Sequence, residues 1–332
     1  MHDAFAQTAK ITGIGAFRPE RVLTNHDLEA IVETSDEWIT TRTGIRERRV
    51  VAEGEGLVDL AERAGKAAMV DAGVDPASVD LVIVATATPE QPIPASAAIV
   101  QPRLGTTNAA CFDLSAACSG FVYAANVARQ FIATGAARRV LVIGAECLTR
   151  YMDWSDRTTC VLFGDGAGAV VLEPAPAGEG ILQVDWITDG AYADMIAMPG
   201  GGCRFPPSSH EAIDQRLPFI KMRGNETFKV AVRALTELSL SVLESAGMRP
   251  EDLDLFIPHQ ANIRILQAVG SRLGLGEDKV FTNVQTTGNT SAASIPLAMA
   301  DAVAEGRLKR GDLVLASAFG GGLTCASMLF RY

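Results

Sequence analysis

The chain has 332 residues, of which 48% are hydrophobic and 20% are charged, and its formal net charge at pH 7 is −10. This size and apolar content predict a folded globular protein with a sizeable core, and the acidic excess disfavours a nucleic acid partner. No apolar run approaches the roughly 20 residues that a membrane-spanning helix needs. The first ten residues carry no basic segment followed by an apolar one, so we expect no secretory signal and a cytoplasmic location.

Six cysteines are scattered along the chain without a C-x-x-C pair or a cysteine and histidine spacing of the zinc type. This pattern argues against a disulfide framework and against a structural metal site. Because free cysteine is usually buried, we expect most of the six to be reduced and buried: Cys111, Cys118, Cys147, Cys160, Cys203 and Cys325.

The first predicted strand belongs to a pattern that returns in the second half of the chain. DAGVDPASVDLVIVATAT at 71–88 predicts a helix end, a short turn and a buried strand. SAGMRPEDLDLFIPHQAN at 245–262 predicts the same succession, and Pro250 matches Pro76 at an offset of 174 residues. Both strands are continuous apolar runs, which is typical of strands that helices cover on both faces.

A second pair of segments, at 111–144 and 281–317, predicts strand, small-residue turn, long helix and strand in each half. The repeat favours an α/β fold of two similar halves related by a pseudo-twofold axis. An offset of 171 residues pairs Gly135 with Gly306 and carries Cys118 onto Asn289.

Three segments rich in glycine or proline separate these units. EPAPAGEG at 173–180 is the predicted boundary, which divides the chain into halves at 1–176 and 177–332. MPGGGCRFPPSS at 198–209 has no repeat partner and predicts a surface flap. FGDGAGAVVL at 163–172 lacks the glycine spacing of a phosphate-binding loop, and we interpret it as a structural turn.

DLSAACSGF at 113–121 places Cys118 just before a helix that we expect to begin around Gly120. Free backbone N–H groups and the helix dipole at such a start stabilise an anion, so we predict a lowered thiol pKa and a nucleophilic cysteine. The small neighbours would let a bulky substrate reach the sulfur. They would equally suit a cysteine that only packs.

Two further polar residues follow predicted strands or turns in the second half. His259 in PHQAN ends an apolar strand, although a lone histidine can also be purely structural. Asn289 in TTGNTSAASIP precedes a small-residue helix start, where it can donate hydrogen bonds to an oxyanion or simply cap the helix. Ligands of α/β sheets bind at the carboxyl ends of strands, so we expect Cys118, His259 and Asn289 to converge on one cleft.

Five motifs in this order and spacing, together with SDEWITTRTGIRERR at 35–49, resemble β-ketoacyl-acyl carrier protein synthase III of the thiolase-like superfamily. The resemblance covers essentially the whole chain and implies a layered αβαβα architecture with two pseudo-symmetric halves. It also includes FGGGLT at 319–324, a glycine-rich segment that follows a predicted strand and that, taken alone, could be a tight turn. The motifs are DLSAACSGF, FGDGAGAVVL, PHQANIRI, GNTSAASIPLA and FGGGLT.

The resemblance implies an acyltransferase that initiates type II fatty acid synthesis by decarboxylative Claisen condensation of an acyl-CoA, with acetyl-CoA expected, and malonyl-acyl carrier protein. It implies that Cys118 carries the acyl group and that the backbone N–H groups of Cys118 and Gly321 form the oxyanion hole. His259 and Asn289 would then stabilise the enolate. The coenzyme A thioester is a substrate, so no cofactor is expected.

The resemblance also suggests binding residues. Trp38 and Arg157 match positions that hold the adenine of coenzyme A, although Trp38 could equally pack at a helix start behind the capping box TSDE. Lys229 and Arg264 match carrier-protein contacts. Ile93 matches a position that lines the acyl pocket near a homodimer interface.

Helical spacing adds Arg233 and Arg272 to the basic patch that an acidic carrier protein would need, although most charged helix faces are only solvated. Three alternatives stay open at this point. One is a related condensing enzyme or acyltransferase of secondary metabolism, the second is a non-catalytic partner subunit, and the third is a cysteine hydrolase.

Overall fold

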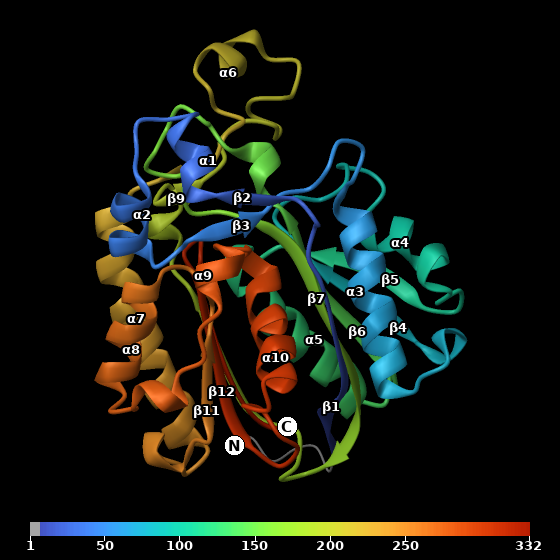
Figure 1. The fold of residues 1–332 in the computed structure, drawn as a ribbon. Helices are drawn as coiled ribbons and strands as arrows, with labels where there is room; N and C mark the ends of the chain where they lie inside the picture. The colour runs from blue at the N-terminus through green and yellow to red at the C-terminus, as the bar shows by residue number, and fades with distance from the viewer. Residues whose placement is uncertain (1–6) are drawn as a thin grey trace.

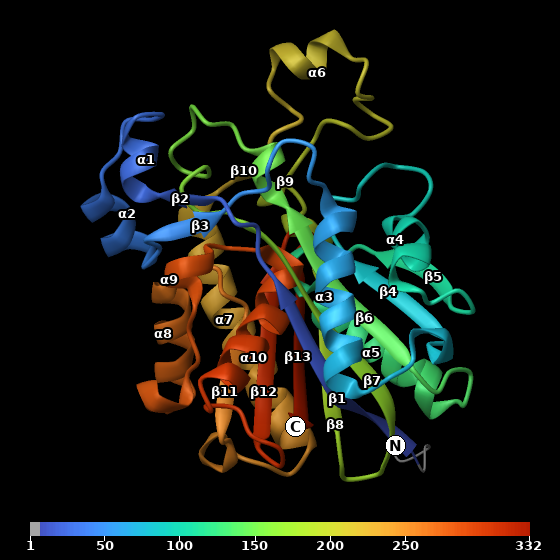
Figure 2. The same cartoon turned by 45° about the vertical axis from the view of Figure 1, so that its right-hand side comes forward.

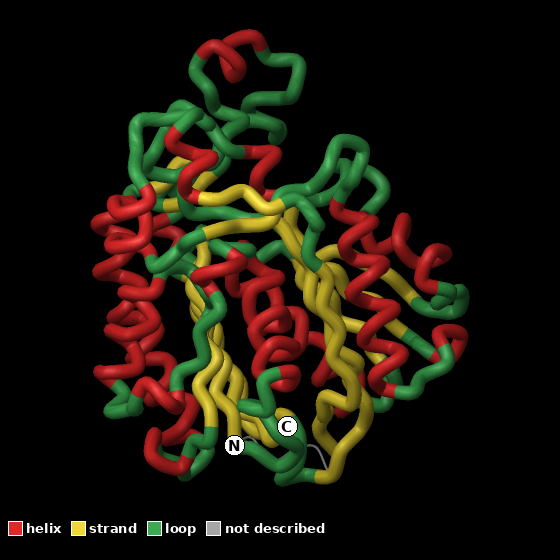
Figure 3. Tube along the Cα trace, viewed as in Figure 1, coloured by secondary structure: helices red, strands yellow, loops and turns green. Residues whose placement is uncertain are grey.

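The computed structural model describes residues 7–332, which form two large β-sheets separated and covered by helices, and two small two-stranded sheets (Figures 1 and 3). The first sheet has the strand order β1-β7-β6-β4-β5 and the second has the order β11-β12-β13-β8. The strands of the first sheet are β1 Gln7–Phe17, β4 Leu81–Ala85, β5 Ala110–Leu114, β6 Val140–Cys147 and β7 Asp165–Pro176. Those of the second are β8 Ile181–Thr188, β11 Leu255–Pro258, β12 Leu313–Gly320 and β13 Thr324–Arg331.

The helices and sheets stack in five layers, which confirms the predicted thiolase-like αβαβα architecture (Figures 1 and 2). Helices α3 and α4 cover the outer face of the first sheet, α5 and α10 lie between the sheets, and α7 and α8 cover the second. The main helices are α3 Leu57–Ala72, α4 Ser96–Leu104, α5 Gly120–Ala133, α7 Gly224–Ser245, α8 Ile263–Arg272 and α10 Ser294–Ala304. Shorter elements are α1 Asn25–Glu29, α2 Asp36–Thr43, α6 His210–Asp214, α9 Val284–Thr287, β2 Val22–Thr24, β3 Glu47–Arg49, β9 Ile196–Ala197 and β10 Lys221–Met222.

The core follows these layers. One buried apolar cluster lies between the two sheets around α5 and α10, a second lies between the first sheet and α3, and a third lies between the second sheet and α7. Strands β4, β6 and β11 are buried along their whole length, as their continuous apolar sequences predict. Because these strands are covered on both faces, the polar residues that come after them in the chain can lie together only beyond the strand ends.

The two halves have a similar order of strands and helices, but they differ at one edge of the sheet. All strands of the first sheet precede Pro176 and all strands of the second follow Ile181, on either side of the proposed boundary at 176/177. In the first sheet β5 pairs in parallel with β4 over five residues. In the second, the corresponding partner of β11 is reduced to a single bridge between Phe256 and Val280.

The structure corrects the register of the repeat at the turn before the central helices. Ala117 (φ 47°) and Ser291 (φ 46°) have the same left-handed backbone, and each lies three residues before its helix, α5 or α10. The offset there is therefore 174, which pairs Cys118 with Ala292 rather than with Asn289. The offset of 171 applies only after the helices, because α10 has 11 residues and α5 has 14.

The segment at 163–172 is a strand for most of its length, so its interpretation as a turn was wrong. Residues from Asp165 onward form β7, which pairs antiparallel with both β1 and β6. Its glycines serve packing: a Cβ on Gly168 would lie 2.7 Å from the backbone nitrogen of Leu297 on α10. A glycine-rich sequence thus lets the central helix approach the sheet closely.

The segment between β9 and β10 projects from the body and carries the short helix α6 (Figures 1 and 2). Most residues of 198–209 are exposed, which confirms the predicted surface flap. The two strands at its base, β9 and β10, pair with each other and lie beside the functional site described next. Among the helices that the structure describes, none is long and apolar enough to cross a membrane.

Candidate active site

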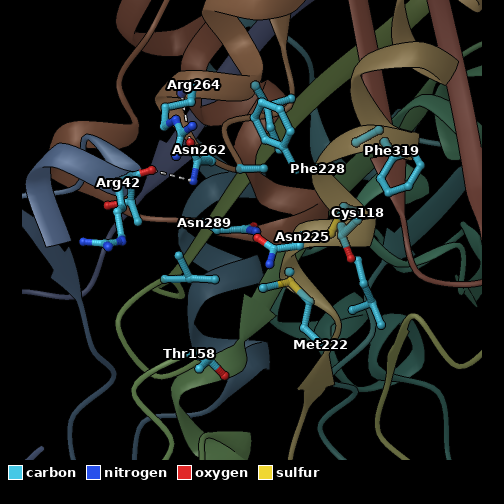
Figure 4. Close-up of a pocket in the computed structure, with 18 of the residues that line it drawn as sticks. Arg42, Cys118, Thr158, Met222, Asn225, Phe228, Asn262, Arg264, Asn289 and Phe319 are labelled. Carbon is cyan, nitrogen blue, oxygen red and sulfur yellow. Dashed lines mark hydrogen bonds between the residues drawn. The ribbon is translucent and has the colours of Figure 1, made fainter. Parts of the chain in front are cut away.

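Two cavities meet at Cys118. The larger cavity has a volume of about 460 Å³, and its lining includes Trp38, Cys118, His259 and Asn289 (Figure 4). The smaller cavity has a volume of about 360 Å³ and a mostly apolar lining. It includes Cys118, Leu148, Phe163, Met198, Ile220 and Gly321. Cys118 thus lies at the junction of the two cavities, of which the larger also presents the polar side chains of His259 and Asn289.

The predicted helix start around Gly120 is confirmed, because α5 begins at Gly120 after a 3-10 turn at Ala117–Ser119 that contains Cys118. The positive φ of Ala117 turns the chain so that Cys118 reaches the cavities. The turn packs closely on strand β12: a Cβ on Gly320 would lie 2.6 Å from the backbone nitrogen of Cys118. The left-handed turn and the glycine beneath it together place the cysteine.

The predicted lowering of the Cys118 thiol pKa was wrong in direction. Burial and, to a smaller extent, the nearby Glu146 carboxylate raise the pKa of this thiol to about 12, because a hydrogen bond with the Ser291 hydroxyl only partly opposes them. Cys118 is half-buried and lines both cavities. In the ligand-free molecule the thiol is therefore protonated at neutral pH, and its activation requires substrate or a proton acceptor.

His259 directly follows β11, as predicted, and its side chain is buried at 4% exposure. The ring is anchored by Nδ1, which lies 2.6 Å from Oγ of Ser294. The backbone N–H of His259 donates to the Ser317 carbonyl at 2.8 Å. Burial lowers the pKa of the imidazole to about 3, so His259 is neutral at physiological pH.

Three hydrogen bonds hold Asn289 in place at the lining of the larger cavity. Its backbone N–H donates to the Leu162 carbonyl at 2.8 Å, and its own carbonyl accepts from the Gly164 N–H at 3.0 Å. Its side-chain Oδ1 accepts the Ser291 N–H at 2.9 Å. This cap-like bond leaves the NH₂ group of Asn289 to face the cavity as a donor.

Gly321 lines the smaller cavity next to Cys118. A Cβ at this position would lie 2.6 Å from the Ile196 carbonyl oxygen on β9, so the site accepts no larger residue without displacing the base of the flap. This close packing is the structural reason for a glycine in the FGGGLT segment.

Trp38 lies under two cations at the mouth of the larger cavity. The guanidinium of Arg42 lies 4.5 Å from the centre of the Trp38 ring and that of Arg157 lies 5.3 Å from it. Arg157 does not line the cavity itself. Arg42 was not predicted from the sequence, although its position one turn after Trp38 on α2 could have indicated it. The cap of α2 is Ser35, whose hydroxyl accepts the Trp38 N–H at 3.1 Å.

The structure brings two of the four predicted basic residues to the larger cavity. Lys229 on α7 and Arg264 on α8 line it, whereas Arg233 and Arg272 lie on the same helices outside the lining. Asn262 caps α8 by accepting the Arg264 N–H, and its amide donates to the Arg42 carbonyl at 3.1 Å (Figure 4).

Ile93 is the one predicted site residue that stands apart. Its side chain is 85% exposed and lines neither cavity. Within residues 7–332, no group of three or more His, Cys, Asp or Glu side chains is placed to hold a metal ion.

Comparison with known proteins places this chain in a family. Residues 112–190 match a family model described as 3-oxoacyl-[acyl-carrier-protein (ACP)] synthase III, and residues 243–332 match the model of its C-terminal part. The chain is 52% identical over 325 residues to the β-ketoacyl-[acyl-carrier-protein] synthase III of Alkalilimnicola ehrlichii, which spans 98% of this chain and 99% of that protein. The chain belongs to the β-ketoacyl-acyl carrier protein synthase III family.

Solved structures agree with this assignment. The synthase III of Aquifex aeolicus VF5 superposes with a TM-score of 0.90 at 48% identity, covering 98% of this chain and all of that one. A priming β-ketosynthase from the R1128 polyketide biosynthetic pathway superposes with a TM-score of 0.90 at 35% identity, covering 100% and 98% of the two chains. As a β-ketoacyl-acyl carrier protein synthase III, the protein is a condensing acyltransferase that initiates fatty acid synthesis.

Proposed function

We propose that this synthase joins an acyl-CoA primer, with acetyl-CoA as the expected one, to malonyl-acyl carrier protein through an acyl group carried on Cys118. The observation that carries the proposal is that Cys118, His259 and Asn289, from three separate segments, line one cavity. A second, apolar cavity begins at the same sulfur and offers space for an acyl chain. A purely packed cysteine would need neither.

In the first half-reaction, the Cys118 thiol gives up its proton and the sulfur attacks the thioester carbonyl of the acyl-CoA. The carbonyl oxygen becomes an oxyanion, which the backbone N–H groups of Cys118 and Gly321 stabilise. The tetrahedral intermediate collapses and expels the coenzyme A sulfur, which leaves as a thiol after taking up the proton that Cys118 released. The product of this step is an acyl-cysteine thioester.

In the second half-reaction, malonyl-acyl carrier protein enters the larger cavity and loses CO₂, which leaves its electron pair on an enolate. The neutral side chains of His259 and Asn289 donate hydrogen bonds to the enolate oxygen. The enolate carbon attacks the acyl-Cys118 carbonyl, and the Cys118 sulfur leaves and regains a proton. The β-ketoacyl group stays on the carrier protein.

The binding residues divide between the two substrates. Trp38, with Arg42 and Arg157 over its ring, would hold the adenine of coenzyme A by stacking and cation–π contact. Lys229 and Arg264 at the same cavity would attract the acidic carrier protein despite the overall charge of −10. Neither role needs a metal or a prosthetic group.

We propose that the enzyme acts as a homodimer in the cytoplasm and that Ile93 meets the acyl pocket only across the dimer contact. The exposed position of Ile93 in the single chain supports such a contact. We also propose that the chain divides into two halves, at 1–176 and 177–332. Sedimentation of the purified protein would test the dimer.

The main test is transfer of label from radioactive acetyl-CoA. Stable label on wild-type protein that malonyl-acyl carrier protein then discharges as acetoacetyl-acyl carrier protein is the expected result. Label that water alone removes would indicate a hydrolase, and absence of label would indicate a non-catalytic partner subunit.

The likeness to a priming β-ketosynthase favours one second candidate, a priming role in secondary metabolism. A panel of acyl-CoA primers of increasing length separates these two roles.

A further inference from the structure

The hydroxyl of Ser294 contacts the His259 ring but has no role in the reaction steps described above. Ser294 is the first residue of α10 and is only 2% exposed. Its Oγ lies 2.6 Å from Nδ1 of His259 and 3.4 Å from the backbone nitrogen of Gln260. Within residues 7–332, Ser294 Oγ has no hydrogen-bond partner besides these two.

The protons around this hydroxyl can be assigned. A serine hydroxyl donates one hydrogen bond and accepts up to two, and a neutral imidazole has one donor nitrogen and one acceptor nitrogen. The Gln260 N–H can only donate, so it occupies a lone pair of Ser294 Oγ. The one proton of Ser294 then has a single acceptor in reach, which is Nδ1 of His259.

We propose that Ser294 is a positioning residue, whose hydroxyl donates to Nδ1 and thereby holds His259 in the tautomer that carries its proton on Nε2. This inference rests on the proposed function of the site. In this tautomer the ring presents an N–H donor to the larger cavity, which suits an enolate oxygen. A ring of this kind cannot take the proton of Cys118 at Nε2, so His259 serves the condensation step and not the activation of the thiol.

The second donor of the site is oriented from the same segment. Asn289 Oδ1 accepts the backbone N–H of Ser291, which fixes the amide with its NH₂ group toward the cavity. Ser291 and Ser294 both lie in the turn that begins α10. The start of α10 thus orients both donors before substrate arrives, and preorganised donors of this type need no rearrangement in the transition state.

The tautomer can be observed without any turnover. The chain contains four histidines, so ¹⁵N-histidine labelling of the full-length protein gives few ring signals, and the His259→Asn variant identifies those of His259. The expected spectrum shows a protonated Nε2 and an unprotonated Nδ1 for His259 at pH 7. A proton on Nδ1 in the wild-type protein would overturn the proposal, whatever the enzyme condenses.

The effect on the reaction is tested with Ser294→Ala, which removes the hydroxyl and adds no bulk. We expect acylation of the variant by acetyl-CoA within about twofold of wild type. We expect kcat for malonyl decarboxylation to fall by about 10-fold to 100-fold, with little change in KM, as is usual when an outer partner of a functional histidine is lost. Ser294→Thr keeps the hydroxyl and should restore part of the rate.

Ser239→Ala is the matched control, because Ser239 is a fully buried serine whose hydroxyl pairs with Ser317 at 2.9 Å and does not touch the imidazole. It should leave both steps unchanged. Wild-type decarboxylation by Ser294→Ala, or an equal loss in acylation and decarboxylation, would overturn the positioning role. If the wild-type protein failed to decarboxylate malonyl-acyl carrier protein at all, the proposed function would fall while the spectrum still reported the tautomer.

Discussion

The turns before α5 and α10 have the same backbone but different chemistry. Each contains one residue in the left-handed region, Ala117 or Ser291, three positions before its helix. The next residue is Cys118 in the first turn and Ala292 in the second. Cys118 faces both cavities, whereas Ala292 is 1% exposed and its N–H approaches the buried Glu146 carboxylate at 3.4 Å.

Each turn also packs against the sheet of the other half. The turn before α5 lies on β12 of the second sheet, and the turn before α10 lies on β6 of the first. The pseudo-twofold axis therefore brings both turns to the centre of the molecule, where we propose that one supplies the nucleophile and the other orients the two hydrogen-bond donors. One repeated backbone conformation can therefore serve two different roles through a change of side chains alone.

The largest expected effect comes from removing the chemistry of the first turn. Cys118→Ala makes the first turn resemble the second, and we expect it to abolish acyl-enzyme formation because, among residues 7–332, Cys118 is the one nucleophile that lines both cavities. Incubation with radiolabelled acetyl-CoA and mass spectrometry of the intact protein measure this. Cys111→Ala is the control, since Cys111 lies in neither cavity lining. Undiminished label on the Cys118→Ala protein would refute the assignment.

The next effect removes a donor that the second turn orients. We expect Asn289→Ala to acylate normally but to lose about 10²-fold to 10³-fold in malonyl decarboxylation, the usual cost of one oxyanion donor. The Oδ1 contact with Ser291 is lost as well, so thermal unfolding should be followed to show that the fold survives. A variant that condenses at the wild-type rate would exclude the enolate role.

The sequence could predict this convergence in part, because two of the three residues follow strands. His259 comes directly after β11, and Cys118 comes four residues after the end of β5, whereas Asn289 follows the short helix α9. Polar residues that follow strands gather at the carboxyl ends of the strands. The register of the repeat was harder to predict, because the three-residue difference lies inside helices whose small residues align at either offset. The strand at 163–172 was missed because glycines that admit a helix look like glycines of a turn.

The properties that depend on tertiary surroundings could not be predicted. A helix start favours a thiolate, but the burial of Cys118 and the nearby Glu146 come from distant segments and reverse the expected direction of its pKa. The role of Ser294 was equally hidden, since its partner His259 is 35 residues away. Ser294 was nevertheless visible in the quoted GNTSAASIPLA motif, so the motif contained more of the site than its Asn289 alone.

A smaller effect tests the close packing under the two turns. A Cβ on Gly320 would collide with the backbone nitrogen of Cys118, and one on Gly144 would collide with the Ala292 carbonyl. We expect Gly320→Ala and Gly144→Ala each to lower the free energy of unfolding by about 1–3 kcal/mol, the usual cost of overpacking. Urea denaturation measures this.

The two glycine variants should differ in activity. Gly320→Ala displaces the nucleophile and should slow acylation, whereas Gly144→Ala disturbs the donor side and should slow decarboxylation more. Equal losses in both steps for both variants would show that the two turns do not divide the roles as proposed. Gly54→Ala is unsuitable as a control because its φ of 79° adds strain of its own, but Gly190→Ala meets open space and should change little.

The last effect concerns the pH dependence of stability, because Glu146 lies between the two turns. Burial raises the pKa of Glu146 from 4.5 to about 7, so between these values the folded protein binds a proton that the unfolded chain has lost, and stability falls as pH rises. His259 acts in the opposite sense, since burial lowers its pKa from 6.5 to about 3 and stability falls as pH decreases through this window. Between pH 4.5 and 6.5 the two contributions oppose each other.

Glu146→Gln removes the first contribution and leaves the second. Relative to wild type, we expect the free energy of unfolding of this variant to gain about 1.4 kcal/mol for each pH unit from 4.5 toward 7, because one proton is no longer released on unfolding. Urea denaturation of both proteins at several pH values measures the difference, and groups shared by the two cancel. Adding His259→Asn should remove the remaining rise between pH 4.5 and 6.5. If the free energy of unfolding of Glu146→Gln changed with pH in parallel with that of wild type, the Glu146 carboxyl group would be ionised in both the folded and the unfolded state. The buried group between the two turns would then be a carboxylate and not a carboxylic acid.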